Sequence, residues 1–343
     1  MGTNAKRVLL PSPMVDPAGE ALLGRVVEVV RGGALDEAER DRVLPTVHGI
    51  YGRATAAEIE AATSLEVIGS GGSGVDGIDV GAATEHGVLV VNAAGAQASA
   101  VAEHAIGLML ALGKRIAASD RLLRRERRFP DRREYLGDAW PVGAPRELHG
   151  RTLGLVGLGE VGRELARACR TAFAMDVLAF DPYVERADAA AAGAELVDGL
   201  DDLLAHSHVV SLHVPLTPET RHLLGERELR RMRADAYLVN LARGGVVDDA
   251  ALVRALREGW IAGAGLDVFD PEPLPADHPL FELENVVLTP HIGGWTAESL
   301  PRLACTTANE MLAALRGERP ARLVNPQAWP AFVARCSATG AHR

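Results

Sequence analysis

The chain has 343 residues, a length that favours two domains, and its 48% hydrophobic and 24% charged residues suit a globular protein with a sizeable core. Its formal net charge of −10 argues against a nucleic-acid or membrane-surface partner, since either would need a basic surface. Aromatic residues make up only 4%, so small aliphatic side chains must fill the core, as is typical of helices packed on parallel strands.

The first hundred residues alternate short aliphatic runs with helical segments, which predicts a parallel α/β layer. The predicted strands are 8–10, 26–30, 48–51, 65–69 and 88–92, and the predicted helices include 55–62 and 78–86.

The next segment changes character along its length. Residues 101–112, VAEHAIGLMLAL, are apolar nearly all round, which predicts a buried helix. Residues 121–133, RLLRRERRFPDRR, are rich in arginine and contain Pro130. One interpretation is a solvated helix that ends before Pro130; the other is part of a subunit interface, where arginines pair with acidic groups of a partner.

A second strand–helix series begins at Arg151 and predicts another parallel layer. The tail after Asn325 has weak periodicity, and we expect it to fray after Cys336. The predicted strands of this series are 152–156, 176–180, 208–214, 236–240, 262–268 and 286–288.

The three cysteines, Cys169, Cys305 and Cys336, form no CxxC pair, so neither a disulfide framework nor a zinc site is predicted. No apolar signal-peptide segment follows the N-terminus, and the longest apolar stretch, 105–113, is far shorter than the roughly 20 residues of a membrane span. These features predict a soluble, cytoplasmic protein.

Residues 151–162, RTLGLVGLGEVG, place Gly157, Gly159 and Gly162 in a G-x-G-x-x-G pattern between an aliphatic strand and a helix. The first glycine permits a tight turn, the second lets the backbone approach a pyrophosphate, and the third lets helix and strand pack closely. Glu160 and Val161 open the helix, whose N-terminal N–H groups attract phosphate. The segment predicts a dinucleotide site.

The following strand, 176–180, ends at Asp181, 24 residues after Gly157. A carboxylate at that position accepts hydrogen bonds from the ribose hydroxyls and repels a 2′-phosphate. We therefore expect NAD rather than NADP as the cofactor.

Six further motifs follow one another in an order that resembles the D-isomer-specific 2-hydroxyacid dehydrogenase family. They are GSGVDGID (72–79), VAEH (101–104), HVPLTPET (213–220), VNLARGGVVDD (239–249), GLDVFDPEP (265–273) and TPHIGG (289–294). The resemblance implies two Rossmann- or flavodoxin-like α/β domains with parallel sheets. It places an NAD-binding domain at 101–291, inserted into a substrate-binding domain formed by 1–100 and 292–343.

The resemblance also implies hydride transfer between NAD(H) and a small D-2-hydroxy acid or 2-oxo acid. Arg243, at a strand end, matches the arginine that binds the substrate carboxylate and polarises the ketone. His291 matches the general acid/base, and Glu272 matches the carboxylate that orients it. The two lie 19 positions apart, so their contact must be tertiary.

Several residues are assigned to the cofactor groove by the same resemblance. Asp267 corresponds to the aspartate that binds the nicotinamide carboxamide. The remaining residues are His213, Val214, Pro215, Leu241, Ala242 and Gly293.

A glycine-rich loop near residue 70 is the candidate for the substrate carboxylate. The N–H groups of Gly72, Ser73 and Gly74 can form an anion-binding nest, and the alternative is a plain tight turn between strand and helix. Arg53, on the preceding loop, is a weaker candidate for a second substrate oxygen.

Three histidines that are close in sequence, His206, His208 and His213, lack a suitable set of acidic or cysteine partners, so we predict no metal site. The resemblance implies a homodimer formed through residues 101–140, with Trp140 near the partner's site.

The substrate stays open between glyoxylate, hydroxypyruvate and a larger 2-oxo acid. A 3-phosphoglycerate dehydrogenase is a second alternative, weakened because relatives of that kind commonly carry arginine where Ser70 stands. A third is a non-enzymatic, NAD(H)-sensing protein similar to the corepressors of this fold.

Overall fold

The structure is a computed structural model that describes residues 5–127, 129, 131 and 144–339. The chain divides into two compact units. The first unit comprises Met1–Gln97 and Trp295–Arg343, and the second comprises Ala98–Gly294. Trp140 lies outside the described residues.

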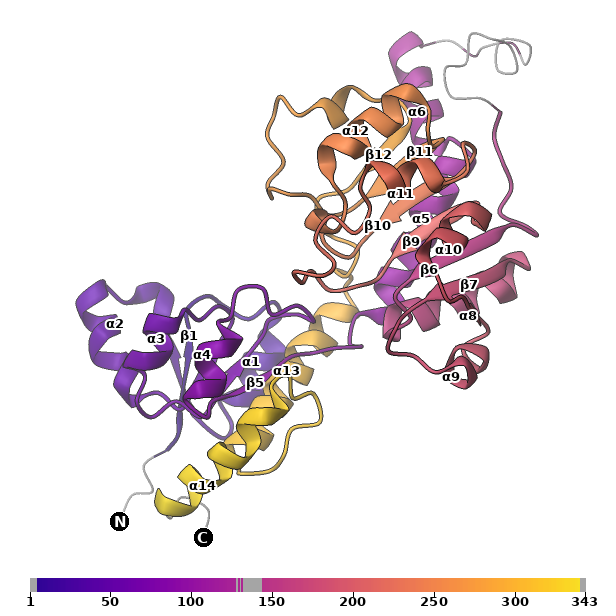
Figure 1. Ribbon diagram of the computed structural model, residues 1–343. Helices are drawn as coiled ribbons and strands as arrows, with labels where there is room; N and C mark the ends of the chain where they lie inside the picture. Colours follow the sequence, from indigo (N-terminus) through magenta and orange to yellow (C-terminus); the bar gives the residue numbers. More distant parts are fainter. Residues whose placement is uncertain (1–4, 128, 130, 132–143, 340–343) are drawn as a thin grey trace. The chain divides into compact units, whose positions relative to one another are not determined.

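The first unit, which contains the indigo and yellow ends of the chain (Figure 1), is built on a five-stranded parallel sheet. Its strands follow the order β2-β1-β3-β4-β5. Because the order reverses between β1 and β3, this unit has the switch point at which open α/β sheets bind ligands, at the carboxyl ends of the strands. Its strands are β1 (Arg7–Leu10), β2 (Glu28–Arg31), β3 (Gly49–Tyr51), β4 (Val67–Gly69) and β5 (Leu89–Val91). Its helices are α1 (Pro17–Leu23), α2 (Glu37–Val43), α3 (Ala56–Ala61), α4 (Val80–Glu85), α13 (Ser299–Leu315) and α14 (Trp329–Thr339), with short 3-10 helices at Gly32–Ala34, Leu44–Thr46 and Pro326–Ala328.

Alternation along each strand of the first unit sends side chains to two cores. Val8 and Leu10 pack with residues of α1 and α13, whereas Leu9 packs on the opposite face with residues of α3 and α4. Strands buried on both faces read as unbroken aliphatic runs, which is why the sequence pattern finds them.

The second unit holds a seven-stranded parallel sheet in the order β12-β11-β10-β9-β6-β7-β8. This order reverses between β6 and β9, which defines the switch point of a Rossmann sheet. Its strands are β6 (Thr152–Val156), β7 (Asp176–Phe180), β8 (Glu195–Leu196), β9 (Val209–Leu212), β10 (Tyr237–Asn240), β11 (Gly263–Leu266) and β12 (Val286–Leu288). Its helices are α5 (Ala98–Gly113), α6 (Ile116–Glu126), α8 (Glu160–Phe173), α9 (Arg186–Ala191), α10 (Leu200–His206), α11 (Glu226–Arg231) and α12 (Asp249–Glu258), with 3-10 helices at Gly244–Val246 and Pro279–Glu282.

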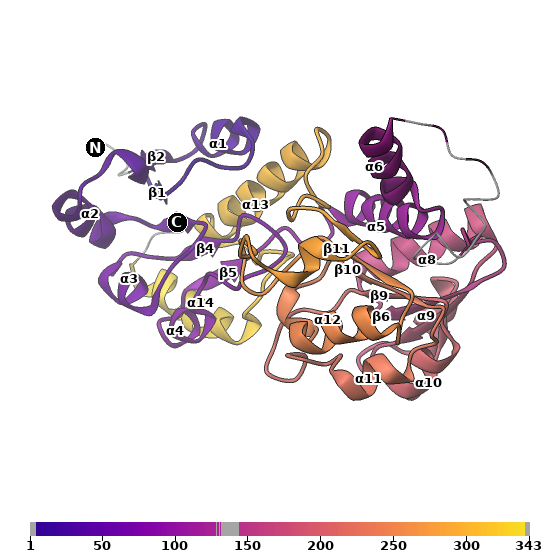
Figure 2. The same ribbon diagram turned by 90° about the horizontal axis from the view of Figure 1, so that it is seen from above.

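Two groups of helices cover the two faces of this sheet (Figure 2). Leu153 and Leu155 of β6 pack with residues of α5 and α8, and Val210 and Leu212 of β9 pack with residues of α10, α11 and α12. Helices therefore pack on both faces of the sheet, and the loops that follow the carboxyl ends of the strands lie at its edge.

The two all-parallel sheets confirm the predicted α/β fold class. The predicted buried helix 101–112 is confirmed within α5, and the helix expected before Pro130 is α6, which ends at Glu126. Two points differ. Strand β8 was not predicted, because a strand of two residues is too short to show an alternating pattern. Helix α14 continues past Cys336 to Thr339, where fraying was expected, because Phe332 anchors the helix in the core.

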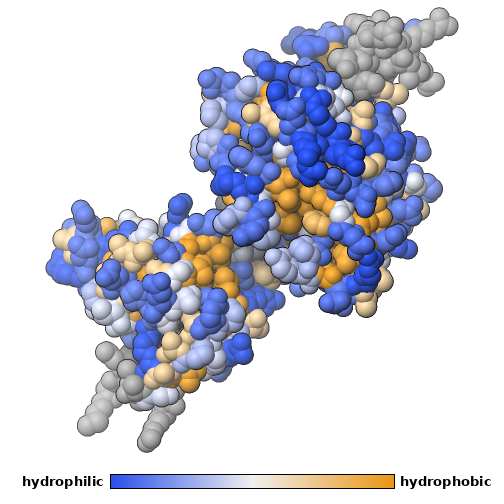
Figure 3. Space-filling model, in the orientation of Figure 1, coloured by the Kyte–Doolittle hydropathy of each residue, from blue (hydrophilic) through white to orange (hydrophobic). Residues whose placement is uncertain are grey.

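None of the described helices combines the length and apolarity needed to cross a membrane. The visible face of the molecule is largely hydrophilic, with scattered apolar patches (Figure 3).

Candidate functional site

The glycine-rich turn after β6 has the backbone geometry of a phosphate cradle. Gly157 has φ +95°, and a Cβ there would lie 2.8 Å from the carbonyl oxygen of His213, so only glycine fits the turn. A Cβ on Gly159 would meet open space, and one on Gly162 would lie 2.6 Å from the Gly157 oxygen. The turn thus approaches β9 closely, and its middle glycine faces a space that a pyrophosphate can fill.

Helix α8 starts directly behind this turn. Gly159 is its N-cap and supplies no side-chain hydrogen bond. Glu160 and Val161 form its first turn, whose N–H groups carry the positive end of the helix dipole. The residues present therefore fit the phosphates of a dinucleotide.

Asp181 follows β7 and braces the glycine turn. Its Oδ2 accepts a hydrogen bond from the Leu158 N–H at 2.8 Å, and its Oδ1 accepts one from the Tyr183 N–H at 3.0 Å. A carboxylate offers about four acceptor sites, so two remain for the ribose hydroxyls. The sequence pattern does not reveal this second, structural task of Asp181.

His213 leaves β9 on the other side of the switch point. Its Nε2 lies 2.9 Å from the Ser211 Oγ, and burial of the ring lowers the pKa of His213 to about 4, although part of the residue reaches the surface. The imidazole is therefore neutral at pH 7. A neutral ring directly after β9 donates or accepts hydrogen bonds without adding charge.

The lowered pKa makes a stability prediction. The ordinary value is 6.5, so the unfolded chain binds this proton more tightly than the folded chain. The neutral His213 ring contributes fully to the free energy of unfolding above pH 6.5, and this contribution is lost as the pH falls from 6.5 through 4. We expect His213→Gln to reduce the loss of stability between pH 7 and pH 4 by about 2–3 kcal/mol, measured by urea unfolding.

His48 and His208 also have lowered pKa values. The pH dependence of the free energy of unfolding of the unaltered protein therefore does not by itself identify His213. The difference between the His213→Gln variant and the unaltered protein isolates His213. Parallel stability curves for the two proteins would contradict the assignment.

The remaining residues predicted for the cofactor groove gather around these strand ends. Val214 lies beside the position a Cβ of Gly157 would take, and Leu241 lies beside the corresponding position of Gly293. The Ala242 N–H donates to Asn240, and the Pro215 oxygen accepts from a threonine hydroxyl at 2.6 Å. The structure thus places each of them in a loop that follows a strand of the second unit.

Arg243 lies in the loop after β10, and a buried asparagine shapes that loop. Asn240 is 1% exposed; its amide donates to the Arg243 carbonyl at 3.0 Å, and its oxygen accepts from the Ala242 N–H at 3.0 Å. The Arg243 Nη1 donates to the Ala242 carbonyl at 2.7 Å. Next in the chain, a Cβ on Gly244 would overlap the backbone carbonyl of Phe269, so this loop packs directly on the loop that contains Glu272.

Glu272 and His291 form a hydrogen-bonded pair, with the His291 Nδ1 2.8 Å from the Glu272 Oε2. The other carboxylate oxygen accepts from the Phe269 N–H at 2.9 Å, which fixes the carboxylate. The His291 side chain is 47% exposed and that of Glu272 is 36% exposed, so a substrate can reach the imidazole. A carboxylate at Nδ1 leaves Nε2 as the atom that exchanges a proton.

His291 has φ +55°, in the left-handed region that few non-glycine residues adopt. The turn around it is held by Asp267, which is 2% exposed. The Asp267 Oδ1 accepts from the Ile292 N–H at 3.0 Å and its Oδ2 accepts from the Gly293 N–H at 2.8 Å. Asp267 was predicted as a cofactor ligand, and in the structure it also anchors the turn of His291.

The glycine-rich loop of the first unit follows β4. The Ser70 Oγ donates to the Gly74 carbonyl at 2.5 Å and closes the loop, while the Ser73 carbonyl accepts from Asn92 at 2.7 Å. The Gly72 N–H, predicted as a nest donor, instead donates to the Ser70 Oγ at 3.3 Å, because the hydroxyl that closes the loop also faces it. Among the described residues no acceptor takes the N–H groups of Ser73 or Gly74, and a Cβ on Gly72 would meet open space. The loop has the features of an anion nest.

Arg53 is exposed in the loop after β3, next to the switch point of the first sheet. Its aliphatic stem lies against Gly77, where a Cβ would be 2.9 Å from the Arg53 Cγ. The guanidinium is thereby presented at the carboxyl edge of this unit.

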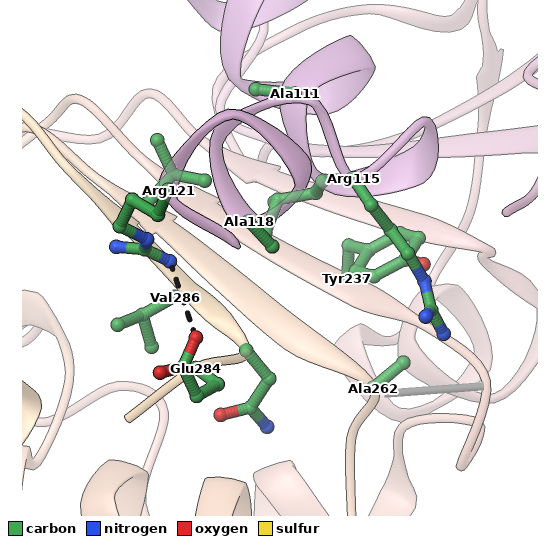
Figure 4. A pocket seen from close by; sticks show the side chains of 11 residues that line it. Ala111, Arg115, Ala118, Arg121, Tyr237, Ala262, Glu284 and Val286 are labelled. Carbon is green, nitrogen blue, oxygen red and sulfur yellow. Dashed lines mark ion pairs between the residues drawn. The ribbon is translucent and has the colours of Figure 1, made fainter. Parts of the chain in front are cut away.

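A small pocket at the opposite edge of the second sheet is not a substrate site (Figure 4). It lies between α5, α6 and the amino ends of β10–β12, where Tyr237 and Arg115 contribute to its lining and Arg121 pairs with Glu284 at 3.9 Å. Its volume of about 20 Å³ has room for a water molecule only.

The three histidines rejected as metal ligands have other contacts. The His206 ring bonds the Asp202 carbonyl at 2.8 Å, and the His208 Nδ1 accepts from the Thr152 N–H at 3.1 Å. Within the described ranges no group of three potential ligands could hold a metal ion.

Comparison with known proteins places these features in a family. Residues 106–293 match the family model described as D-isomer specific 2-hydroxyacid dehydrogenase, NAD binding domain. The chain is 44% identical over 272 residues to the glyoxylate reductase of Thermofilum pendens, covering 78% of this chain and 77% of the relative. A glyoxylate reductase structure from Paecilomyes thermophila matches with a TM-score of 0.83 at 30% identity, covering 95% of this chain and 100% of that one.

A second group of relatives has another name and a greater length. The chain is 43% identical over 267 residues to the D-3-phosphoglycerate dehydrogenase of Methanocaldococcus jannaschii, covering 78% of this chain and 49% of the relative. It thus spans about half the length of that relative.

Proposed function

The chain belongs to the D-isomer-specific 2-hydroxyacid dehydrogenase family and has its NAD-binding domain, and from this premise we propose that it interconverts a small 2-oxo acid and its D-2-hydroxy acid. The observation that carries the proposal is the hydrogen bond of 2.8 Å between His291, in the loop after β12, and Glu272, in the loop after β11. The adjoining strands β10 and β11 lead to Arg243 and Asp267. A base, an orienting carboxylate and a cation thus belong to one edge of one sheet.

In the direction of reduction, His291 acts as the general acid. Bound NADH supplies a hydride to the ketone carbon. The His291 Nε2 gives its proton to the ketone oxygen, which becomes the hydroxyl, and Glu272 stabilises the protonated ring and keeps its Nε2 aimed at the substrate. Arg243 binds the carboxylate with its planar fork and draws electron density from the ketone.

The cofactor is held by the loops that surround the switch point of the second sheet. Gly157, Gly159, Glu160, Val161 and Gly162 bind the pyrophosphate, and Asp181 binds the adenosine ribose. Asp267 has about one acceptor position left for the carboxamide, since three hydrogen bonds already reach its oxygens. The groove is completed by His213, Val214, Pro215, Leu241, Ala242 and Gly293.

Substrate recognition by the first unit is part of the proposal. The N–H groups of Ser73 and Gly74 bind carboxylate oxygens, while Gly72, whose N–H donates to the Ser70 Oγ, leaves open space beside them, and Arg53 binds a further oxygen or the substrate side chain. Ser70 favours a glyoxylate or hydroxypyruvate substrate over 3-phosphoglycerate. It is 6% exposed and committed to closing its own loop, so it provides no cation for a phosphate group.

The experiment is a panel of 2-oxo acids offered to the purified protein with NADH or NADPH, followed at the absorbance of the reduced cofactor. The panel contains glyoxylate, hydroxypyruvate, phosphohydroxypyruvate and an aromatic 2-oxo acid. We expect turnover with NADH on an unphosphorylated member and little with NADPH. If the protein bound NADH but turned over no 2-oxo acid of the panel, the enzymatic proposal would be contradicted and an NAD(H) sensor favoured.

We also propose that the protein works in the cytoplasm as a homodimer. Cys169 and Cys305 are free thiols, which suits a reducing compartment. Helix α6 has no buried residue and exposes Ile116, which supports a role for this helix in subunit contact.

A further inference from the structure

We propose that His104 is a positioning residue that holds the turn of His291 through Thr289 and Asp267. The proposal rests on the function proposed above, because it assumes that His291 exchanges the proton. His104 is the last residue of the VAEH motif and has no part in the mechanism as described. It lies in α5, and its Nε2 is 3.0 Å from the Thr289 Oγ1 and 3.7 Å from the Asp267 Oδ1.

Asp267 is the centre of this arrangement. Its carboxylate is buried, and a buried charge must be matched by donors. It receives the Thr289 hydroxyl at 2.6 Å and the backbone N–H groups of Ile292 and Gly293 at 3.0 and 2.8 Å. Those two N–H groups come directly after His291, so the carboxylate fills a nest that the turn itself makes.

Thr289 determines which atom of His104 bears a proton. A threonine hydroxyl has one hydrogen, and here it is directed at Asp267. The hydroxyl oxygen can then only accept from the imidazole, so the Nε2 of His104 must be the donor. The chain of hydrogen bonds runs in one direction, from His104 to Thr289 to Asp267.

His104 connects this chain to a rigid element. The neighbouring α5 residues Ala105, Leu108 and Met109 are buried in the core of the second unit. The ring also lies close to the turn, since a Cβ on Gly293 would be 3.4 Å from the His104 Cδ2. A packed helix therefore fixes the position of a loop.

The turn needs such support because of the backbone of His291. A left-handed histidine persists only where surrounding contacts impose the conformation. A displacement of about 1 Å in a reacting group lowers a rate about 10²-fold. Loosening the 289–293 turn therefore slows the chemical step. It weakens only the nicotinamide end of the proposed cofactor groove, at Asp267 and Gly293, and leaves the glycine turn and Asp181 unaltered, so NADH affinity changes less than kcat.

The test compares two substitutions of similar size. His104→Gln keeps an N–H near the position of Nε2, and His104→Leu removes it. We expect His104→Leu to lower kcat about 10–30-fold with KM and the NADH Kd changed less than about threefold, while His104→Gln stays within about threefold of the unaltered kcat. Equal losses in both variants, or a loss confined to NADH affinity, would overturn the proposal.

A second readout needs no substrate and so separates this proposal from the enzymatic one. Hydrogen exchange of the Ile292 and Gly293 amides is expected to be about tenfold faster in His104→Leu and unaltered in His104→Gln. Amides of β6 serve as the control for global stability. Unchanged exchange at Ile292 and Gly293 in His104→Leu would overturn the positioning role, even if the protein turned over no 2-oxo acid.

Discussion

Replacement of His291 by asparagine is expected to lower kcat about 10²–10⁴-fold and to leave NADH affinity within about threefold. Asparagine tolerates the left-handed backbone that the structure gives this position at φ +55°, so the turn is kept while the imidazole is removed. The ketone oxygen then has no acid at the position that Glu272 orients. The measurement is steady-state turnover together with fluorescence titration of NADH.

The chain offers a matched control for this variant. His278 also pairs with a carboxylate, its Nε2 lying 2.9 Å from the Asp249 Oδ2 at the start of α12. His278→Asn removes a histidine–carboxylate pair of nearly the same length outside the proposed chemistry, and we expect its kcat to stay within about twofold. Equal losses of kcat in the two variants would mean that loop stability, not proton transfer, explains the effect at His291.

The strands of the second unit were the part of the fold most accessible to prediction. The predicted ranges 152–156, 176–180 and 286–288 coincide with β6, β7 and β12. Each is a short aliphatic run in a strand covered on both faces, so the pattern that marks burial also marks the strand. The predicted strands of the first unit, and the other three predicted in the second unit, differ from the observed ones by one or two residues at their ends, where side chains of loop residues are also buried.

The proximity of Glu272 to His291 was not accessible to local reasoning. The 19 positions between them have no periodicity that would bring them together, and family resemblance alone suggested the pair. The sheet supplies the physical reason: β11 and β12 are parallel neighbours, so the loops that leave their carboxyl ends begin at the same edge. That argument requires the strand order, which no single segment encodes.

The anchoring role of Asp267 was missed for a related reason. A strand-end aspartate in this family suggests a ligand to the cofactor, and nothing in the sequence says that Thr289 and two following N–H groups face it. The signal that was available lay in the VAEH motif. His104 belongs to that motif, and a partly buried histidine in a largely apolar helix needs a polar partner.

Arg243→Lys is expected to lower kcat/KM about 10²–10³-fold, the loss typical of removing one donor from a preorganised oxyanion site. Lysine keeps the charge but replaces a planar fork by a single point of contact, so it cannot hold a carboxylate and polarise a ketone together. The loss should fall on both kcat and KM, because the carboxylate contact acts in the ground state and the ketone contact strengthens as the oxygen gains charge.

The control is Arg254→Lys, an exposed arginine of α12 that pairs with Glu226 away from the strand ends. Surface ion pairs of this kind contribute little to stability, so its kinetic constants should not change. In the Arg243→Ala protein, added guanidinium should restore part of the turnover, because the loop built by Asn240 and Gly244 leaves the space of the side chain in place. If Arg243→Lys retained full kcat/KM, the substrate would be bound by other groups, and Arg243 would serve only the packing of its loop against Phe269.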